Sequence, residues 1–135
     1  MLMRTAIFGA LMALTVTAAA GEDYPHSANY FLPGCKSQDA PPNVTVDEAW
    51  KRGLCAGAVY GITYLILEAR LARDSPHQEV RDELRWFCAD IPRAATNGQI
   101  IRVIVAYIEA RPSRLHESFS VLAIEALRDA WPCRN

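Results

Sequence analysis

Cysteine is the residue type in this sequence with the widest choice of chemistry, because a thiol can act as a nucleophile, bind a metal ion or form a disulfide. The chain of 135 residues has four cysteines, which are Cys35, Cys55, Cys88 and Cys133. Their spacing gives no C-x-x-C pair, and no histidines are paired at metal-ligand spacing, so the pattern argues against a zinc site. An even number of cysteines instead indicates two disulfides in an oxidising compartment, with three connectivities open.

The other groups that could act in catalysis are scattered along the chain. His26 belongs to an irregular N-terminal arm, His77 lies in a predicted loop, and His116 lies in the first turn of the last predicted helix. Acidic pairs such as Asp47–Glu48 are adjacent in sequence, so on a helix their carboxylates point apart. No G-x-S-x-G elbow surrounds the serines near the last predicted helix, which are Ser113, Ser118 and Ser120. The sequence therefore predicts a protein that is not an enzyme and uses no metal or cofactor.

The first 20 residues have the features of a secretory signal peptide. Arg4 supplies a positive start, residues 6–16 form an apolar run, and Ala18 and Ala20 are small residues of the kind that signal peptidase accepts. A membrane anchor is the weaker alternative, since a span needs about 20 apolar residues and this run is shorter. We therefore expect cleavage after Ala20 and export to the periplasm, which leaves one domain over residues 21–135.

The charge of the exported part argues against nucleic acid as a partner. Removing Arg4 from the 14 basic residues leaves 13 against 15 acidic ones, so the net charge is −2. Basic residues are interleaved with acidic ones along the chain, whereas nucleic-acid binding requires a stripe of one sign. The expected partner is therefore a protein.

The longest predicted helix covers residues 45–73. Thr45 and Glu48 have the spacing of a capping box, in which each side chain bonds the backbone amide of the other residue. Apolar residues then recur at helical spacing with no proline to interrupt them. Residues 56–67 are almost wholly apolar but too few to span a bilayer, which takes about 20 residues. We therefore expect a buried core helix and no membrane span after signal cleavage.

Two glycines within that apolar stretch, Gly57 and Gly61, form a G-x-x-x-G step. Each glycine destabilises a helix by roughly 1 kcal/mol relative to alanine, so a compensating gain in packing is expected. In a membrane the step suggests helix dimerisation. In a water-soluble domain it lets a neighbouring helix approach closely, and this second interpretation is favoured here.

Further helices are predicted over residues 27–32, 77–87, 96–111 and 113–131. Thr96 and Gln99 open the third of these with capping-box spacing, although its β-branched residues make a strand a competitor. Pro112 suits the first turn of the last helix. The predicted fold class is all-α, a small disulfide-stapled bundle of about four to five helices.

This arrangement of helices favours one disulfide connectivity. Pairing Cys35 with Cys55 ties the N-terminal arm to the long helix. Pairing Cys88 with Cys133 ties the bend before the helix over residues 96–111 to the end of the last helix and closes an antiparallel hairpin. In the chain-entropy model, loops of this size stabilise the fold by roughly 3 and 4 kcal/mol.

An ordered set of residues along most of the chain resembles a known family. It consists of a Cys-x-Gly-x-x-x-Gly helix step, a Phe-Cys pair with a later proline, a Gly-Gln-Ile helix start and a Trp-Pro-Cys end. The residues are Cys55, Gly57, Gly61, Phe87, Cys88, Pro92, Gly98, Gln99, Ile100, Val105, Tyr107, Ile108, Arg111, Pro112, Leu115, His116, Ala126, Leu127, Ala130, Trp131, Pro132 and Cys133. In this order and spacing, residues 30–133 resemble the Rap/Tai family, immunity proteins that protect bacteria from type VI secretion amidase effectors.

The resemblance implies a mostly helical periplasmic protein, often a homodimer, that occludes the catalytic cleft of a cysteine–histidine peptidoglycan amidase. It implies that the matched cysteines are structural and that a loop blocks the partner. Asp74, Ser75 and His77 are the candidate partner-binding residues, because their composition is that of an exposed loop. One departure is Ala58, since family members commonly have an aromatic residue directly after the first glycine.

Two other functions stay open from the residues alone. A periplasmic stress or chaperone-like binding protein would unfold partly in acid and bind dyes and unfolded chains through apolar surface. A hydrolase of unknown type would require His77 or His116 to act in turnover.

Overall fold

The structure, a computed structural model, describes residues 24–40 and 43–133, and the predicted signal peptide lies outside the described residues. Within these ranges the chain is helical, which confirms the predicted all-α class. The α-helices are α1 (Ala28–Lys36), α2 (Val46–Ala72), α3 (Gln78–Leu84), α4 (Asn97–Glu109) and α5 (Phe119–Ala130). Short 3₁₀-helices are η1 (Ser37–Asp39), η2 (Arg85–Phe87) and η3 (Pro112–Arg114). The β-branched segment after Thr96 is therefore helix, as expected.

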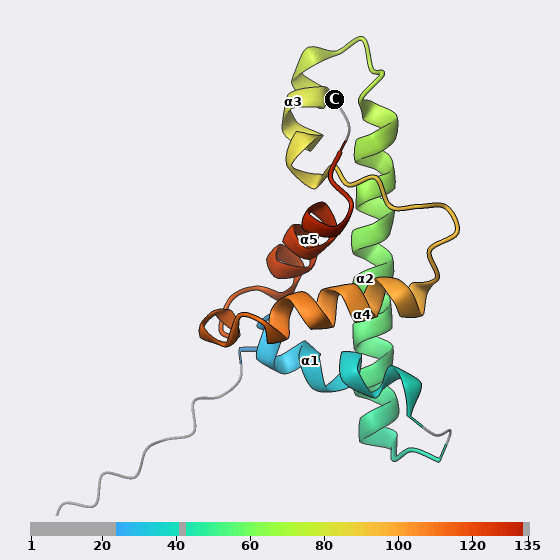
Figure 1. Cartoon of the computed structure of the whole chain (residues 1–135), viewed down its shortest axis with the longest axis vertical. Helices are drawn as coiled ribbons and strands as arrows, with labels where there is room; N and C mark the ends of the chain where they lie inside the picture. The colour runs from blue at the N-terminus through green and yellow to red at the C-terminus, as the bar shows by residue number, and fades with distance from the viewer. Residues whose placement is uncertain (1–23, 41–42, 134–135) are drawn as a thin grey trace, which may run out of the picture.

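Helix α2 runs along the length of the molecule, and α1 and α4 cross it while α3 lies beside its C-terminal end (Figure 1). Its predicted capping box is present. The Glu48 amide donates to Thr45 Oγ1 at 3.3 Å, and the Thr45 amide donates to Glu48 Oε2 at 2.8 Å. These bonds satisfy amides that a helix start otherwise leaves without partners.

The core forms where the apolar faces of α2, α4 and α5 meet. Its largest fully buried side chains include Ile66 of α2, Ile104 and Ile108 of α4, and Phe119 and Leu122 of α5. Burying a side chain of this size stabilises a fold by about 1.5–3 kcal/mol. Because α4 and α5 each present one apolar face, they pack mainly on each other.

Both disulfides join the cysteines that sequence reasoning paired. Cys35 of α1 bonds to Cys55 of α2, with 5.2 Å between Cα atoms, and Cys88 bonds to Cys133 with 5.7 Å. Next to the second bridge, Ala89 and Pro132 form an isolated antiparallel bridge. The two cross-links therefore fasten α1 to α2 and the segment before α4 to the end of the chain beyond α5.

The last helix begins later than predicted, at Phe119 instead of Ser113. The chain after η3 pairs with the start of α1 instead of coiling. The Ala28 amide donates to the Glu117 carbonyl at 2.9 Å, and the Phe119 amide donates to the His26 carbonyl at 2.8 Å. His116 is therefore in a turn before α5, because these tertiary bonds compete successfully with helix formation.

Within the described residues, no other helix packs on Gly57 and Gly61, the glycines for which the sequence predicts a close helix approach. Both glycines are exposed, and a Cβ atom added at either one would meet nothing within 4 Å. The close helix approach occurs at Gly34, where an added Cβ would lie 2.1 Å from the Lys51 carbonyl oxygen. Gly34 thus lets α1 rest directly on the α2 backbone beside the Cys35–Cys55 bridge.

Helix α2 is also less buried than predicted. Its 27 residues pass a test of length and hydropathy for a membrane-crossing helix, a test that core helices of water-soluble proteins also pass, but only 28% of the tested window is buried. Cys55, Val59, Ile62, Ile66 and Ala69 face the core. The opposite side of the same apolar stretch faces outward, so residues 56–67 are buried on one side only.

Candidate partner-binding surface

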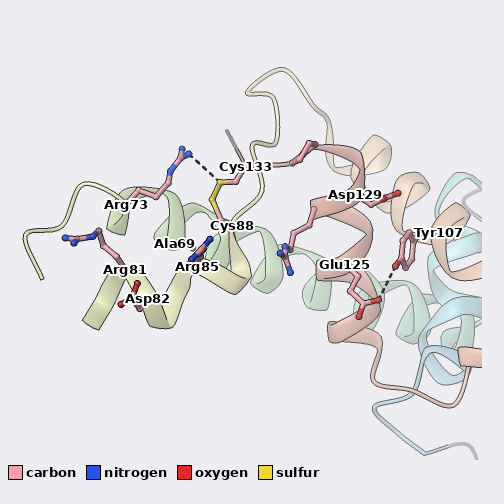
Figure 2. Close-up of a pocket in the computed structure, with 12 residues that line it drawn as sticks. Ala69, Arg73, Arg81, Asp82, Arg85, Cys88, Tyr107, Glu125, Asp129 and Cys133 are labelled. Carbon is pink, nitrogen blue, oxygen red and sulfur yellow. Dashed lines mark hydrogen bonds between the residues drawn. A yellow bond between two sulfur atoms is a disulfide. The ribbon is translucent and has the colours of Figure 1, made fainter. Parts of the chain in front are cut away.

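A cleft of about 690 Å³ opens between the C-terminal end of α2, α3 with η2, and α5 (Figure 2). Arginines and acids line it, together with the Cys88–Cys133 disulfide. The charged lining residues are Arg73, Arg81, Asp82, Arg85, Glu125, Arg128 and Asp129. Its volume lies within the range of ligand-binding pockets.

Local helical structure puts two of these arginines on one side of the cleft. Arg81 and Arg85 are four residues apart in the continuous helical stretch formed by α3 and η2, so their side chains project from the same face. Arg81 Nη1 also donates a hydrogen bond to the Ser75 carbonyl. That bond fastens the loop between α2 and α3 to the cleft wall.

Two further arginines are anchored by one carboxylate. Asp90 Oδ1 lies 3.2 Å from Arg73 Nη2 and 3.6 Å from Arg70 Nε. The Asp90 side chain is only 15% exposed, and its backbone amide donates to the Trp131 carbonyl at 2.9 Å. This cluster holds the end of α2 against the chain segments around the second disulfide.

Arg85 and Arg128 have no ion pair within residues 24–40 and 43–133. The Arg128 guanidinium instead lies 5.8 Å from the centre of the Trp86 ring, which is 40% exposed. Asp82 is likewise without an ion pair in the described part of the chain. Arginine and tryptophan are the residue types that contribute most often to strong protein contacts, so this rim of the cleft is chemically suited to binding a protein.

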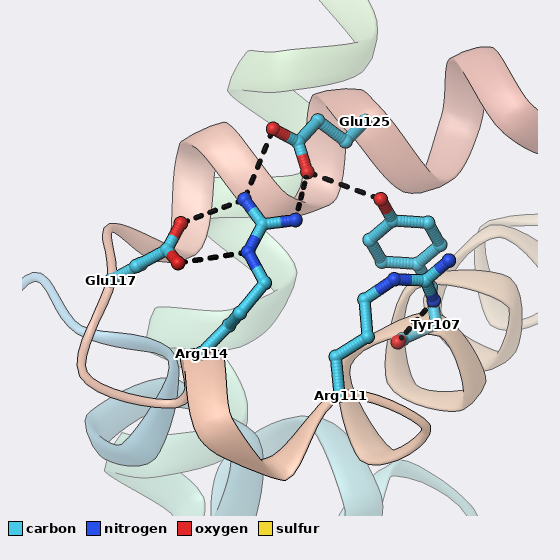
Figure 3. A network of polar contacts seen from close by, with 5 residues as sticks. All are labelled: Tyr107, Arg111, Arg114, Glu117 and Glu125. Atoms are coloured by element: carbon cyan, nitrogen blue, oxygen red, sulfur yellow. Dashed lines mark hydrogen bonds and ion pairs between the residues drawn. The ribbon is translucent and has the colours of Figure 1, made fainter.

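A polar network joins η3 and α4 to α5 beside the cleft, which its members Tyr107 and Glu125 also line (Figure 3). Arg114 donates to both carboxylates of its neighbours, with Nη2 at 2.7 Å from Glu117 Oε2 and Nη1 at 2.7 Å from Glu125 Oε2. The Tyr107 hydroxyl donates to Glu125 Oε2 at 3.1 Å. The Arg111 guanidinium lies 3.5 Å from the centre of the Tyr107 ring. The network ties η3 and the last turns of α4 to α5.

The protonation equilibria of the network favour its charged form. Hydrogen bonds from Arg114 lower the pKa of Glu117 and that of Glu125, whereas burial raises the pKa of Tyr107. At neutral pH the carboxylates therefore remain ionised and the phenol remains protonated. Each of these pKa values is shifted away from pH 7. The network is therefore suited to holding the helices together and not to acid–base catalysis.

The histidines do not converge on the cleft. His26, His77 and His116 are exposed, and none of them lines it. All four cysteines are bonded in disulfides, and no group of three metal-ligating side chains occurs within the described residues. The arrangement therefore gives no base–nucleophile pair from these residue types in residues 24–40 and 43–133.

The loop singled out from the sequence borders the cleft. Asp74 and His77 are exposed, and Ser75 is half-buried because its carbonyl accepts from Arg81 and its amide donates to the Ala72 carbonyl at 3.0 Å. Ser75 Oγ also accepts from the His77 amide at 3.2 Å. The structure thus combines a fixed, exposed loop with the neighbouring arginines in one surface.

Sequence reasoning missed the cleft itself. The sequence has four arginines near the cleft, at positions 70, 73, 81 and 85. Acidic residues lie among them, and this mixed pattern is typical of a solvent-exposed helix surface. The contribution from α5 is more than 40 residues away in sequence, so only the packing of α5 beside α3 reveals that Arg128 belongs to the same site.

Comparison with known proteins identifies the family. The family of Rap1a immunity proteins matches residues 27–133, which is most of the chain and includes every described helix. Neither the comparison with curated proteins nor the comparison with solved structures gives a match. Proteins of this family are generally not enzymes and provide immunity against a secreted effector. The chain therefore belongs to the Rap1a family of immunity proteins.

Proposed function

We propose that this chain is a periplasmic immunity protein that binds and occludes a peptidoglycan amidase effector of a type VI secretion system. The observation that carries the proposal is the family match over residues 27–133. The ordered residues that resemble the Rap/Tai family, from Cys55 to Cys133, support the choice of an amidase as the effector. The absence of a base–nucleophile pair among the described cysteines and histidines fits a protein that acts by binding.

Export is the second part of the proposal. Two disulfides in one small domain suit an oxidising compartment such as the periplasm. Residues 1–20 have the composition of a cleaved leader. Expression of the full chain in a Gram-negative host is expected to give a periplasmic protein that begins at Gly21, and intact-mass measurement of that fraction checks it. A cytosolic protein with its first residues retained would contradict export.

We place the contact surface at the α2–α3 loop and the adjoining cleft. Asp74 and His77 project from a loop that Arg81 holds in place, and Arg85 and Arg128 supply guanidinium groups that no acid of the described chain neutralises. A preformed surface loses little conformational entropy on binding, which favours the tight complex that immunity requires.

The experiment first identifies a peptidoglycan amidase gene beside the gene for this chain and then exports its product to the periplasm of a host that also expresses this chain. The wild-type chain is expected to prevent lysis and to form a stoichiometric complex. Asp74→Lys combined with His77→Ala, and separately Arg85→Glu combined with Arg128→Glu, are expected to weaken binding by about tenfold or more. Arg93→Glu is the matched control, because Arg93 is exposed and does not line the cleft.

The possible outcomes test the proposed immunity function and the proposed contact surface separately. No protection against the co-encoded amidase, with the chain present in the periplasm, would contradict the amidase-immunity function. Full protection by both double variants would leave that function standing and would reject the proposed contact surface. Calorimetry with purified proteins measures the affinity, and thermal unfolding shows whether each variant is folded.

We also propose that the chain is a homodimer, as the Rap/Tai resemblance implies. Support comes from the apolar side chains that α2 leaves exposed, since contiguous exposed apolar surface on a soluble protein marks an interaction site.

A further inference from the structure

Three arginines of the cleft have no carboxylate of the described chain beside them. Arg81 and Arg85 project from the α3–η2 side (Figure 2), and Arg128 lines the cleft from α5. None of the three forms an ion pair within residues 24–40 and 43–133. Arg81 and Arg128 are half-buried, and Arg81 donates to the uncharged Ser75 carbonyl. A cation partly removed from water is stabilised by an anion, so the cleft suits a negatively charged group of a ligand.

The acidic residues that line the cleft do not supply this negative charge. The Glu125 carboxylate already accepts hydrogen bonds from Arg114 at 2.7 Å and 3.2 Å and from the Tyr107 hydroxyl at 3.1 Å. Asp82 and Asp129 are exposed, and neither forms an ion pair in the described part of the chain. The half-buried charges of the cleft that lack a counter-charge are therefore cations.

We propose that the cleft receives an acidic side chain of the effector, whose carboxylate binds to Arg85 and Arg128. The inference rests on the proposed immunity function and adds the chemistry by which the effector is recognised. Each guanidinium group presents a planar fork of N–H donors that matches a carboxylate, and one carboxylate has acceptor sites for two such groups. The chain contains a related contact, because Arg114 binds two carboxylates through four hydrogen bonds of 2.7–3.2 Å.

The uncharged part of the lining favours a side chain over a free inorganic anion. Ala69, Pro132 and the Cys88–Cys133 disulfide give the cleft apolar surface beside its arginines. The methylene groups of a glutamate side chain would cover this surface, whereas an inorganic anion would leave it exposed to water. The volume of about 690 Å³ exceeds what one carboxylate fills, so residues flanking the acidic one also fit.

The cleft is continuous with the loop proposed as the contact surface. Arg81 lines the cleft and holds the loop through the Ser75 carbonyl, while Asp74 and His77 of the loop are exposed. A segment of the effector that lies along this loop therefore meets the arginines directly. A protein partner is accordingly the source of the carboxylate that this arrangement fits.

Direct titration of the mature chain, residues 21–135, tests the carboxylate site. The probe is the peptide acetyl-Ala-Glu-Glu-Ala-amide at millimolar concentration in low-salt buffer, where charge interactions are least screened. The Nε–H signals of Arg85 and Arg128 in nitrogen-15 NMR spectra are expected to shift and to saturate. Arg85→Gln and Arg128→Gln should each raise the dissociation constant at least about tenfold. Arg93→Gln is the matched control, because Arg93 is exposed and does not line the cleft.

Two further ligands distinguish the sources of negative charge. The peptide acetyl-Ala-Gln-Gln-Ala-amide has the same size without the charge and should give no shift. Inorganic phosphate should bind more weakly than the glutamate peptide. Equal binding of phosphate would show a general anion site and reject the acidic side chain. No shift with the glutamate peptide, or equal shifts with the glutamine peptide, would overturn the carboxylate site.

A charge exchange tests the effector as the occupant. Each surface aspartate and glutamate of the amidase is replaced in turn by arginine. One replacement is expected to weaken binding to the wild-type chain at least about tenfold, and Arg128→Glu should restore much of that loss. Arg93→Glu should restore nothing. Absence of any replacement with this behaviour would reject the effector as the source of the carboxylate.

Lysis protection separates failure of this inference from failure of the immunity function. Protection and unchanged affinity with Arg85→Gln combined with Arg128→Gln would keep the function and reject the inference. No protection by the wild-type chain would reject the function and, with it, the effector as occupant, even if the glutamate peptide binds. Thermal unfolding shows whether each variant is folded.

Discussion

At the scale of single residues, Arg114 makes four side-chain hydrogen bonds to two carboxylates. Its guanidinium donates to Glu117 in the adjacent turn and to Glu125 of α5. The Tyr107 hydroxyl of α4 donates a further hydrogen bond to Glu125. The three side chains of the Arg114–Glu117–Glu125 set are about one-third exposed, so water screens these ion pairs and their contribution to stability is modest. The bonds to Glu125 join two helices and therefore matter more for the fold than the local pair with Glu117.

The lowered pKa of Glu125 predicts a stability that depends on pH. A carboxyl whose folded pKa lies below its unfolded value of about 4.3 stabilises the fold above that value, and the stabilisation is lost as pH falls through the folded pKa. Glu125→Gln is expected to lower the free energy of unfolding by about 1 kcal/mol at pH 7. It should also flatten the decline in thermal midpoint from pH 5 to about pH 2. Thermal melts over this pH range measure both effects.

Glu83→Gln is the control for that experiment, because it removes the same charge from an exposed position outside the network. Its pH profile should parallel the wild type. A Glu125→Gln profile that also parallels the wild type would mean that Arg114 does not stabilise the ionised carboxyl in solution.

At the scale of elements, the contact between α1 and α2 is the closest helix approach at any described glycine. Gly34 places the α1 backbone against the Lys51 carbonyl, and Cys35 follows at once with its bond to Cys55. Gln38 continues the contact by donating to the Arg52 carbonyl at 3.1 Å. The short α1 is therefore held by its tertiary contacts, since a helix of nine residues is not stable on its own.

Gly34→Ala is expected to destabilise the protein by about 1–3 kcal/mol or more. The new Cβ atom would lie 2.1 Å from a backbone oxygen that cannot rotate away, so α1 must move off α2. Urea denaturation followed by circular dichroism gives the change in the free energy of unfolding. Gly98→Ala is the matched control, because the added atom would meet only the Arg102 side chain at 4.0 Å. Equal stability of the two variants would contradict the close approach.

At the scale of the whole molecule, two cross-links reinforce contacts between segments that are far apart in the sequence. The two cysteines of the Cys35–Cys55 bridge are 20 residues apart in the sequence, and those of the Cys88–Cys133 bridge are 45 residues apart. The second bridge also fixes the relative position of α3, the end of α2 and α5, which form the cleft. Its loss should therefore affect binding as well as stability.

Replacing each pair of cysteines by serine is expected to lower the free energy of unfolding by roughly 3 kcal/mol for Cys35–Cys55 and roughly 4 kcal/mol for Cys88–Cys133. The longer loop gives the larger loss because it restricts the unfolded chain more. Urea unfolding of both double variants, beside the reduced wild type, provides the measurement. A wild-type midpoint unchanged by a reducing agent would show that the bridges are absent or contribute nothing.

Much of the fold could be predicted because its signals are local. The Thr45 and Glu48 capping box, the helix opened by Thr96 and the helical segments on either side of Pro76 depend on side chains within one or two turns of each other. The disulfide pairing followed from the order of these helices. Local patterns failed at residues 113–118, where bonds to the start of α1 replaced helical ones.

The sequence alone determined the all-α class, the positions of most helices and the cysteine pairs, because short-range backbone preferences and chain order control these features. Only the tertiary structure decided which glycine brings two helices together and which apolar surface stays uncovered. Periodicity marks an apolar helix side but does not say what packs on it, so Gly34 and Gly57 could not be told apart in the sequence. The cleft required the structure for the same reason, since Arg85 and Arg128 share one surface only after α5 has packed beside α3.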